Sequence, residues 1–369
     1  MAVILAILGG CLCLYAAFIL LSSWYFYKQP LSGNPDSFPF LSVIVPARNE
    51  EERLLTCLKS ILQQDYPGGF ELILIDDHSE DNTLLLAEKL ALDSPSLSIY
   101  ANPGVGKKAA LAHGVAKARG EFIFQTDADC KLSPSWLKAM QACFDDKTAF
   151  VSGPIALDYI GYFFQPLQAL ESMGLVIFGA GFLLAGKPNM ANGANMAYRK
   201  SVFEELNGFK GVDHVASGDD ELLLQKIKLS GKYSLTFCKN PRAIVRTPAA
   251  SNWATFKEQR IRWVSKARAY VDRLPNLIQG ISYLAFLFFP ILLIASFWQP
   301  FYLKVLLWAF LGKLLVDLVL MYQAARFFHN LQVLRWFIPL QFLYIPYVLW
   351  IGMAGILAKS YSWKGRNVS

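Results

Sequence analysis

The stretch Leu41-Ser-Val-Ile-Val-Pro-Ala-Arg-Asn-Glu50 is an apolar run that ends in a proline and a polar loop. The same order returns twice, as FELILIDDHSED at residues 70–81 and as EFIFQTDAD at residues 121–129. Continuous apolar strands that alternate with helical patterns predict an α/β fold with a mostly parallel sheet covered on both faces. Because ligands in such sheets bind beyond the carboxyl ends of the strands, we expect the functional site at these three polar loops.

Outward from these strands, the composition points to a membrane. Of the 369 residues, 54% are hydrophobic and only 17% are charged, whereas roughly a quarter of an average soluble protein is charged. Residues 1–27 contain no charged residue and end in the aromatic run 24–27. This pattern predicts an uncleaved transmembrane anchor over residues 1–27, because a secretory signal would begin with basic residues and end at a cleavage site.

The last quarter of the chain is also apolar. Residues 276–369 carry seven Lys/Arg and a single acid, Asp317, and contain three apolar runs at about 281–297, 301–321 and 336–357. None of the runs shows the polar stripe of a soluble helix, so we expect about three transmembrane or re-entrant helices in residues 276–369. Residues 28–275 then form the catalytic or binding domain. Because this domain is tethered to a membrane and its 28 Lys/Arg nearly balance 27 acids, we expect the membrane as a partner and no nucleic acid.

The third strand ends in two carboxylates, Asp127 and Asp129. Two acids at this spacing can approach one hard divalent ion and, through it, a diphosphate. The alternative is that the two acids cap the next helix. Ser133 followed by Pro134 is expected to supply that cap, so the acids are not needed for it. The sequence therefore predicts that Asp127 and Asp129 bind a hard divalent ion and, through it, a diphosphate.

Two further features resemble parts of a nucleotide-binding site. Asp76 and Asp77 either cap the helix that begins near Asn82 or accept hydrogen bonds from a nucleotide base, and spacing does not decide between them. The segment 104–108 resembles a phosphate loop but lacks the spacing of a P-loop. Lys107 can still contact phosphate as a point charge.

Together the motifs resemble the family 2 glycosyltransferases, which are inverting enzymes with a GT-A nucleotide-sugar fold. The resemblance runs over residues 41–264. It rests on VIVPARNE, LIDDHSEDNT, GKKAALAHG, TDAD, GANMAYRKSVFEELNGF (193–209), SGDDELL (217–223) and the final QRIRW (259–263). It implies a GT-A domain with a mostly parallel mixed sheet, between transmembrane helices at the two ends of the chain.

On the donor side, the resemblance implies that Pro46, Ala47 and Glu50 lie beside the nucleotide and that Asp76 or Asp77 reads the base. It also implies that Lys107 approaches the diphosphate and that Asp127 and Asp129 hold Mn²⁺ or Mg²⁺.

On the acceptor side, it implies that a later acid is the general base, and Asp219 is preferred over its neighbour Asp220. The QxxRW motif of the family is matched by Gln259, Arg262 and Trp263, near the acceptor and the diphosphate.

These expectations combine into a membrane glycosyltransferase. It would move a sugar from a nucleotide-sugar, a UDP-sugar before others, to a lipid or lipid-linked glycan with inversion and a divalent metal. Six cysteines without CxxC pairs are typical of a reducing compartment, so we expect a multi-pass protein of the cell membrane with a cytoplasmic catalytic domain. The alternatives are a processive polysaccharide synthase and a membrane-anchored nucleotide-binding subunit without turnover.

Overall fold

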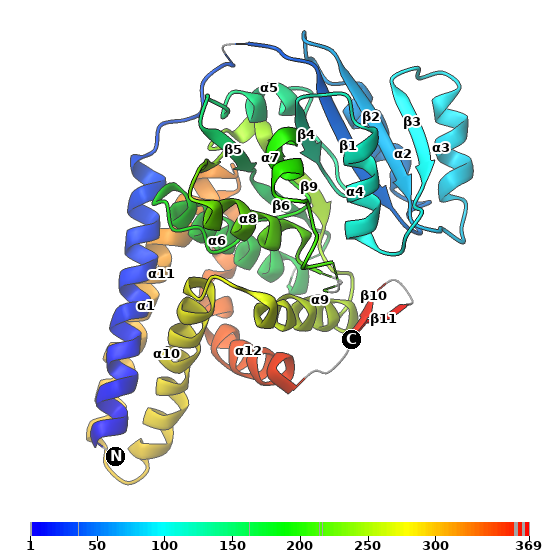
Figure 1. The fold of residues 1–369 in the computed structure, drawn as a ribbon. Coiled ribbons are helices and arrows are strands. Elements are labelled where there is room, and N and C mark those ends of the chain that lie inside the picture. Colours follow the sequence, from blue (N-terminus) through cyan, green and yellow to red (C-terminus); the bar gives the residue numbers. More distant parts are fainter. Residues whose placement is uncertain are drawn as a thin grey trace. The chain divides into compact units, whose positions relative to one another are not determined.

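The structure, a computed structural model, describes residues 2–35, 37–161, 163–213, 215, 217–357, 361–363 and 366–368. The chain groups into two compact units, each formed from several segments (Figure 1). The sheet unit consists of Gln29–Asp158, Pro188–Ala249 and Ser360–Ser369. The helical unit consists of Met1–Lys28, Tyr159–Lys187 and Ala250–Lys359.

Within its described residues, the sheet unit contains a seven-stranded sheet in the order β3-β2-β1-β4-β7-β5-β8. Strand β1 pairs in parallel with β2 and β4, and β2 pairs in parallel with β3. Strand β7 is antiparallel to both β4 and β5, which makes the sheet mixed and confirms the predicted sheet. The strands are β1 (Leu41–Ala47), β2 (Phe70–Asp76), β3 (Leu97–Ala101), β4 (Phe122–Gln125), β5 (Thr148–Ser152), β7 (Met196–Arg199) and β8 (Ser234–Phe237).

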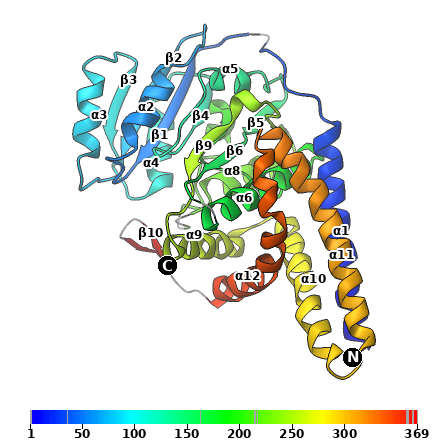
Figure 2. The same ribbon diagram turned by 180° about the vertical axis from the view of Figure 1, so that it is seen from behind.

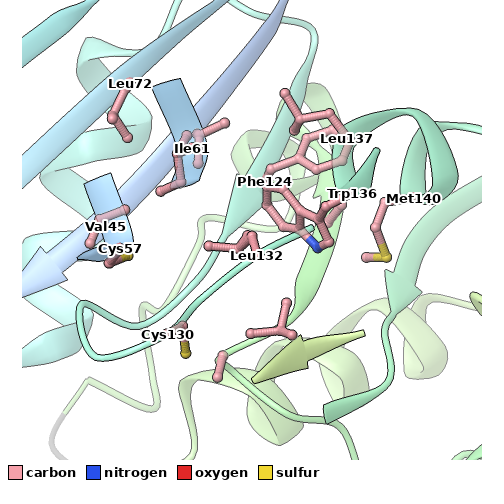
Figure 3. Close-up of a cluster of buried hydrophobic side chains, with 14 of the residues drawn as sticks. Val45, Cys57, Ile61, Leu72, Phe124, Cys130, Leu132, Trp136, Leu137 and Met140 are labelled. Atoms are coloured by element: carbon pink, nitrogen blue, oxygen red, sulfur yellow. The ribbon is translucent and has the colours of Figure 1, made fainter. Parts of the chain in front are cut away.

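Strand β1 is buried on both faces because helices cover both sides of the sheet. Leu41, Val43 and Val45 belong to a core cluster with Leu58 of α2 and Trp136 of α5, as Figure 3 shows in part. Burial of one such aliphatic side chain contributes about 1.5–3 kcal/mol. On the other face α4 packs so closely that a Cβ at Gly114 would lie 2.6 Å from the Ile44 side chain.

The helices of the sheet unit connect these strands. Helix α5 begins at Trp136 with Ser135 at its N-cap, so the predicted cap at Ser133 is wrong. The Ser133 hydroxyl instead donates to the carbonyl oxygen of Arg242, which joins this loop to a distant segment. The helices are α2 (Leu54–Leu62), α3 (Thr83–Ala91), α4 (Lys107–Lys117), α5 (Trp136–Gln141), α7 (Lys200–Glu205), α8 (Asp219–Ser230) and the short η1 (Pro241–Ala243).

Two small sheets complete this unit. Strands β6 (Ile155–Asp158) and β9 (Val245–Pro248) pair in parallel. Strands β10 (Tyr361–Trp363) and β11 (Arg366–Val368) form an antiparallel pair. The remaining residues of the basic tail, whose side of the membrane the sequence leaves open, lie outside the described residues.

In the helical unit, the described part of the chain has five helices long and apolar enough to cross a membrane. Four of them confirm the predicted apolar runs at the two ends of the chain. Helices α1, α10 and α11 lie side by side in both views (Figures 1 and 2). The unit contains α1 (Ala2–Lys28), α6 (Phe164–Leu184), α9 (Trp253–Ser265), η2 (Lys266–Ala269), α10 (Leu274–Ser296), α11 (Phe301–Phe327), η3 (Leu331–Trp336) and α12 (Phe337–Leu357).

The fifth apolar helix, α6, lies in the middle of the sequence and packs on α1 and α11. The Ser22 hydroxyl donates to the carbonyl oxygen of Phe178 at 2.8 Å. A Cβ at Gly181 would lie only 2.1 Å from the carbonyl oxygen of Ser22, so the contact with α1 requires a glycine there. The sequence analysis did not predict α6 as a membrane helix, because Glu171 places a charge within its apolar sequence. In the fold this acid is buried and pairs with Arg260 at 2.6 Å.

Candidate active site

An acid–lysine cluster lies at the carboxyl end of β4. The ammonium Nζ of Lys107 is 2.7 Å from Oδ1 of Asp127 and 3.3 Å from Oδ2 of Asp219. Burial disfavours the charged form of this lysine, but the attraction of Asp127 and Asp219 outweighs burial and raises the pKa of Lys107 above its usual value. The fold therefore brings a cation and two carboxylates from three separate segments into one charged group.

Glycines position two members of this cluster at helix starts. Gly106 has a φ of 92° and precedes Lys107, the first residue of α4. Gly218 has a φ of 80° and precedes Asp219, the first residue of α8. Side chains other than that of glycine are disfavoured at these angles.

Asp219 is not a solvated helix-start residue. Its side chain is only 9% exposed, whereas that of Asp127 is 38% exposed. A buried carboxylate is costly unless it is paired and hydrogen-bonded, and Asp219 has both Lys107 and the Gln125 amide as partners. The exposed Asp127 is the more accessible of the two to a ligand.

The neighbouring acids have different partners. Asp220 accepts a hydrogen bond through Oδ2 from the backbone N–H of Gly193 at 2.9 Å. Asp129 accepts one through Oδ2 from the Thr247 hydroxyl at 3.3 Å. Burial, and then the charges of Asp129 and Asp127, raise the pKa of the Cys57 and Cys130 thiols, so these buried cysteines stay neutral and are not nucleophiles.

The loops after β1 and β2 interlock. The Arg48 guanidinium donates to the carbonyl oxygens of Asp77 and His78 at 2.9 and 2.6 Å. The backbone N–H of Glu50 donates to the Thr83 hydroxyl at 2.7 Å. Strand β1 ends with Pro46 and Ala47, in register with Ile75 and Asp76 of β2.

Asp76 and Asp77 differ in their surroundings. Asp77 accepts through Oδ1 from the Asn102 side chain at 2.7 Å and from the Gly106 N–H at 2.9 Å, so it fixes the segment that leads to Lys107. Asp76 accepts through Oδ2 from the Ser79 N–H, while its buried Oδ1 has no hydrogen-bond partner among the described residues. Neither acid caps α3, whose first N–H is bonded by Asp81.

The predicted acceptor residues Gln259, Arg262 and Trp263 lie on α9, in the helical unit. All three are partly exposed. Between them, Arg260 is buried, pairs with Glu171 and lies over the Trp263 ring at 4.2 Å. The motif therefore presents three side chains around one buried arginine that ties α9 to α6.

The sequence assigned no role to two polar residues beside the cluster. Gln125, at the end of β4, donates to Oδ2 of Asp219 at 2.8 Å. Lys108 is buried and donates to the carbonyl oxygens of Val212 and Val215 at 2.7 and 2.5 Å, in the segment before α8. The only sequence signal for Gln125 is its polarity at the end of an apolar strand, and Lys108 is masked by its neighbour Lys107.

Comparison with known proteins shows what this domain is similar to. Residues 42–207 match the family model described as glycosyl transferase family 2. The glycosyltransferase AglE of Haloferax volcanii is 27% identical over 212 residues, which cover 54% of this chain and 65% of that protein. The dolichyl-phosphate beta-glucosyltransferase ALG5A of Trichomonas vaginalis is 32% identical over 122 residues, 28% of this chain and 38% of that protein.

Among solved structures, the mannosyltransferase PcManGT from Pyrobaculum calidifontis, in complex with GDP-Man and Mn²⁺, superposes with a TM-score of 0.59. It is 20% identical, and the match covers 96% of this chain and 99% of that one. At this identity the likeness concerns the fold. Residues 42–207 of this chain therefore resemble the glycosyl transferase family 2 domain, and the sheet unit has the GT-A fold.

Proposed function

We propose that this protein is a membrane glycosyltransferase that moves a sugar from a nucleotide-sugar, with UDP-sugars as the first candidates, to a lipid or lipid-linked glycan with inversion. The observation that carries the proposal is the cluster of Lys107, Asp127 and Asp219 at the carboxyl end of β4. The lipid acceptor is supported by the apolar helices of this chain and by the dolichyl-phosphate transferase among its relatives. Residues 28–275 would act as the glycosyltransferase domain between the anchor 1–27 and the membrane region 276–369.

For the donor, we assign the reading of the base to Asp76 because its buried Oδ1 lacks a partner among the described residues, while Asp77 is engaged by Asn102 and Gly106. The ends of β1 and β2 and the loops that follow them, with Pro46, Ala47 and Glu50, would line the nucleotide. Lys107 would neutralise the diphosphate, since its ammonium already lies beside Asp127.

The residues present fit a divalent metal bound together with substrate. In the described part of the chain, no group of three or more His, Cys, Asp and Glu side chains could hold a metal alone. Mg²⁺ and similar hard ions are commonly held by one or two carboxylates plus substrate phosphates. Asp127 and Asp129 would be those carboxylates for Mn²⁺ or Mg²⁺, and the ion would offset the charge that develops on the leaving diphosphate.

The chemistry requires a base for the acceptor hydroxyl. Asp219 would accept the hydroxyl proton while the oxygen bonds to the anomeric carbon and the bond from that carbon to the diphosphate breaks. A single displacement of this kind inverts the anomeric configuration. Lys107 holds a positive charge at the site where the leaving group gains negative charge.

For the acceptor, we assign a role to the three residues of the QxxRW motif. Gln259, Arg262 and Trp263 on α9 would contact the acceptor and the diphosphate, and the exposed aromatic residues of α9 and α12, such as Trp253, fit a membrane interface. We place the protein in the cell membrane as a multi-pass protein with the sheet unit in the cytoplasm.

The test is transfer by purified protein with a panel of nucleotide-sugars and membrane lipid extract, with the product mass read directly. Asp127→Asn and Asp219→Asn should each lower transfer by at least about 100-fold while the protein still inserts. Asp146→Asn, at an exposed acid of the same unit, is the matched control and should retain activity.

Three other results are informative. Full activity in either site variant would overturn the assignment. Long products on a gel would indicate a processive polysaccharide synthase. If the wild-type protein binds the donor but neither transfers the sugar nor hydrolyses the donor, it is a nucleotide-binding subunit.

A further inference from the structure

Gln125 is a fully buried polar side chain at the base of the acid–lysine cluster. It is the last residue of β4, two positions before Asp127. Its amide nitrogen Nε2 donates to Oδ2 of Asp219 at 2.8 Å and to the carbonyl oxygen of Gly193 at 3.0 Å. One side chain therefore connects β4, the strand that precedes the predicted metal ligands, to the predicted base.

The backbone at Gly193 completes this arrangement. A Cβ at that position would lie 2.9 Å from Oδ2 of Asp219 and 3.0 Å from Nζ of Lys107, so a side chain there would displace these charged groups. The carbonyl oxygen of Gly193 accepts from Gln125, and its N–H donates to Asp220 at 2.9 Å. The start of α8 is thus tied to one backbone position, and Gln125 makes the link to Asp219.

A glutamine at this position has a cost that an apolar residue would avoid. Its amide oxygen Oε1 is buried and has no hydrogen-bond partner among the described residues. Leucine or methionine would fill a similar volume without burying an unsatisfied polar atom. What the glutamine supplies and an apolar residue does not is the pair of hydrogen bonds from Nε2 to Asp219 and Gly193.

We propose that Gln125 is a positioning residue for Asp219, which rests on the proposed role of Asp219 as the base. Its hydrogen bond fixes Oδ2 and with it the orientation of the carboxylate toward the acceptor hydroxyl. Lys107 contacts the same oxygen at the longer distance of 3.3 Å. In the proposed function, Lys107 is the group that binds the diphosphate. Gln125 is then a contact of Asp219 that persists throughout turnover.

The test compares Gln125→Leu and Gln125→Glu with the wild type in steady-state transfer as a function of pH. Gln125→Leu should lower kcat by about 10–100-fold while KM for the donor stays within about twofold, because orientation and not donor binding is lost. The acid limb of its kcat profile should move to higher pH by about one pH unit, since a carboxylate that loses a donor is protonated more easily.

Gln125→Glu gives an opposite signature. Its carboxylic acid can donate to Asp219 only when protonated, so its activity relative to Gln125→Leu should rise as the pH falls. A purely structural role of Gln125 would give the two variants the same pH profile as the wild type. Gln141→Leu is the matched control, because Gln141 is also buried with an unpartnered Oε1 among the described residues of the same unit.

The outcomes separate this proposal from the proposed function. Unchanged kcat and pH profile in Gln125→Leu, with Asp219→Asn inactive, would overturn the positioning role alone. Full activity in Asp219→Asn would overturn the base assignment and the positioning role together. Loss of donor binding in Gln125→Leu but not in Gln141→Leu would show that Gln125 shapes the donor site instead, which also overturns the proposal.

Discussion

Asp76 and Asp77 follow one another at the end of β2, yet their carboxylates have different hydrogen-bond partners. Asp77 satisfies two donors of the Asn102–Gly106 segment, whereas Oδ1 of Asp76 is buried without a partner among the described residues. A buried acceptor without a donor is costly unless a ligand supplies one. The environment of each carboxylate, not its place in the sequence, separates the two roles.

We expect Asp76→Asn to weaken the binding of UDP by about 10-fold with little change in stability, because it loses a charge-assisted hydrogen bond to the base. Asp77→Asn should instead lower the melting temperature by about 2–6 °C, because a donor of the 102–106 segment loses its acceptor. Calorimetric titration with UDP and Mn²⁺, together with thermal melts, checks both. The reverse pattern would assign the base to Asp77.

At the scale of elements, Glu71 joins the starts of β1 and β2 to the turn before β4. Its Oε1 accepts from the Ser42 hydroxyl at 2.7 Å and from the Arg119 N–H at 2.6 Å, and its Oε2 accepts from Nε of Arg119 at 2.9 Å. Burial alone would raise the pKa of Glu71, but these hydrogen bonds outweigh it and hold the pKa below its usual value.

A carboxyl group whose pKa is lower in the folded state stabilises the fold above its unfolded pKa of about 4.3, and this contribution is lost as the pH falls through the folded value. We therefore expect Glu71→Gln to cost about 1–3 kcal/mol of unfolding free energy at pH 5–7. The difference from the wild type should shrink below about pH 4 in thermal melts. Glu121→Gln removes an exposed ion pair with Arg199 and should have a small effect at every pH. A Glu71→Gln deficit that does not change with pH would contradict this account.

At the scale of the whole molecule, the sheet restricts how α6 can meet a membrane. Strand β5 precedes α6 in the chain and β7 follows it, and the two strands pair in one sheet. The chain must therefore enter and leave α6 on the same side of the membrane, although the helix is long and apolar enough to cross it. We infer that α6 lies within or along the membrane without placing its two ends on opposite sides.

This inference can be checked with single cysteines in a chain without the native ones. Ile160→Cys and Lys187→Cys flank α6, and Leu92→Cys marks the sheet unit; all three positions are exposed. A membrane-impermeant maleimide should label all three from the same side of sealed vesicles. Trp298→Cys, in the connection between α10 and α11, should be labelled from the opposite side if α10 crosses. Labelling of Ile160→Cys and Lys187→Cys from opposite sides would rule the inference out.

The sequence by itself determined the local order of the fold. Apolar runs of strand length, each followed by polar residues, predicted β1, β2 and β4, because a strand buried on both faces must be apolar throughout. Long apolar stretches with few or no charges predicted α1, α10, α11 and α12, because hydrocarbon disfavours charge. The motif resemblance named Lys107, Asp127 and Asp219 as parts of one site, and their roles stay predictions.

Tertiary structure alone decided which partners these residues have. Gln125 reaches Asp219 across 94 positions of the chain. Glu171 is paired with Arg260, 89 positions away. In the sequence this acid therefore argues against an apolar helix, whereas in the fold its charge is neutralised. Such contacts depend on how strands and helices are brought together, and spacing along the chain does not encode distance in space. The sequence therefore specified the elements and the chemical groups, whereas packing decided which carboxylate is hydrogen-bonded, which is exposed and which is buried.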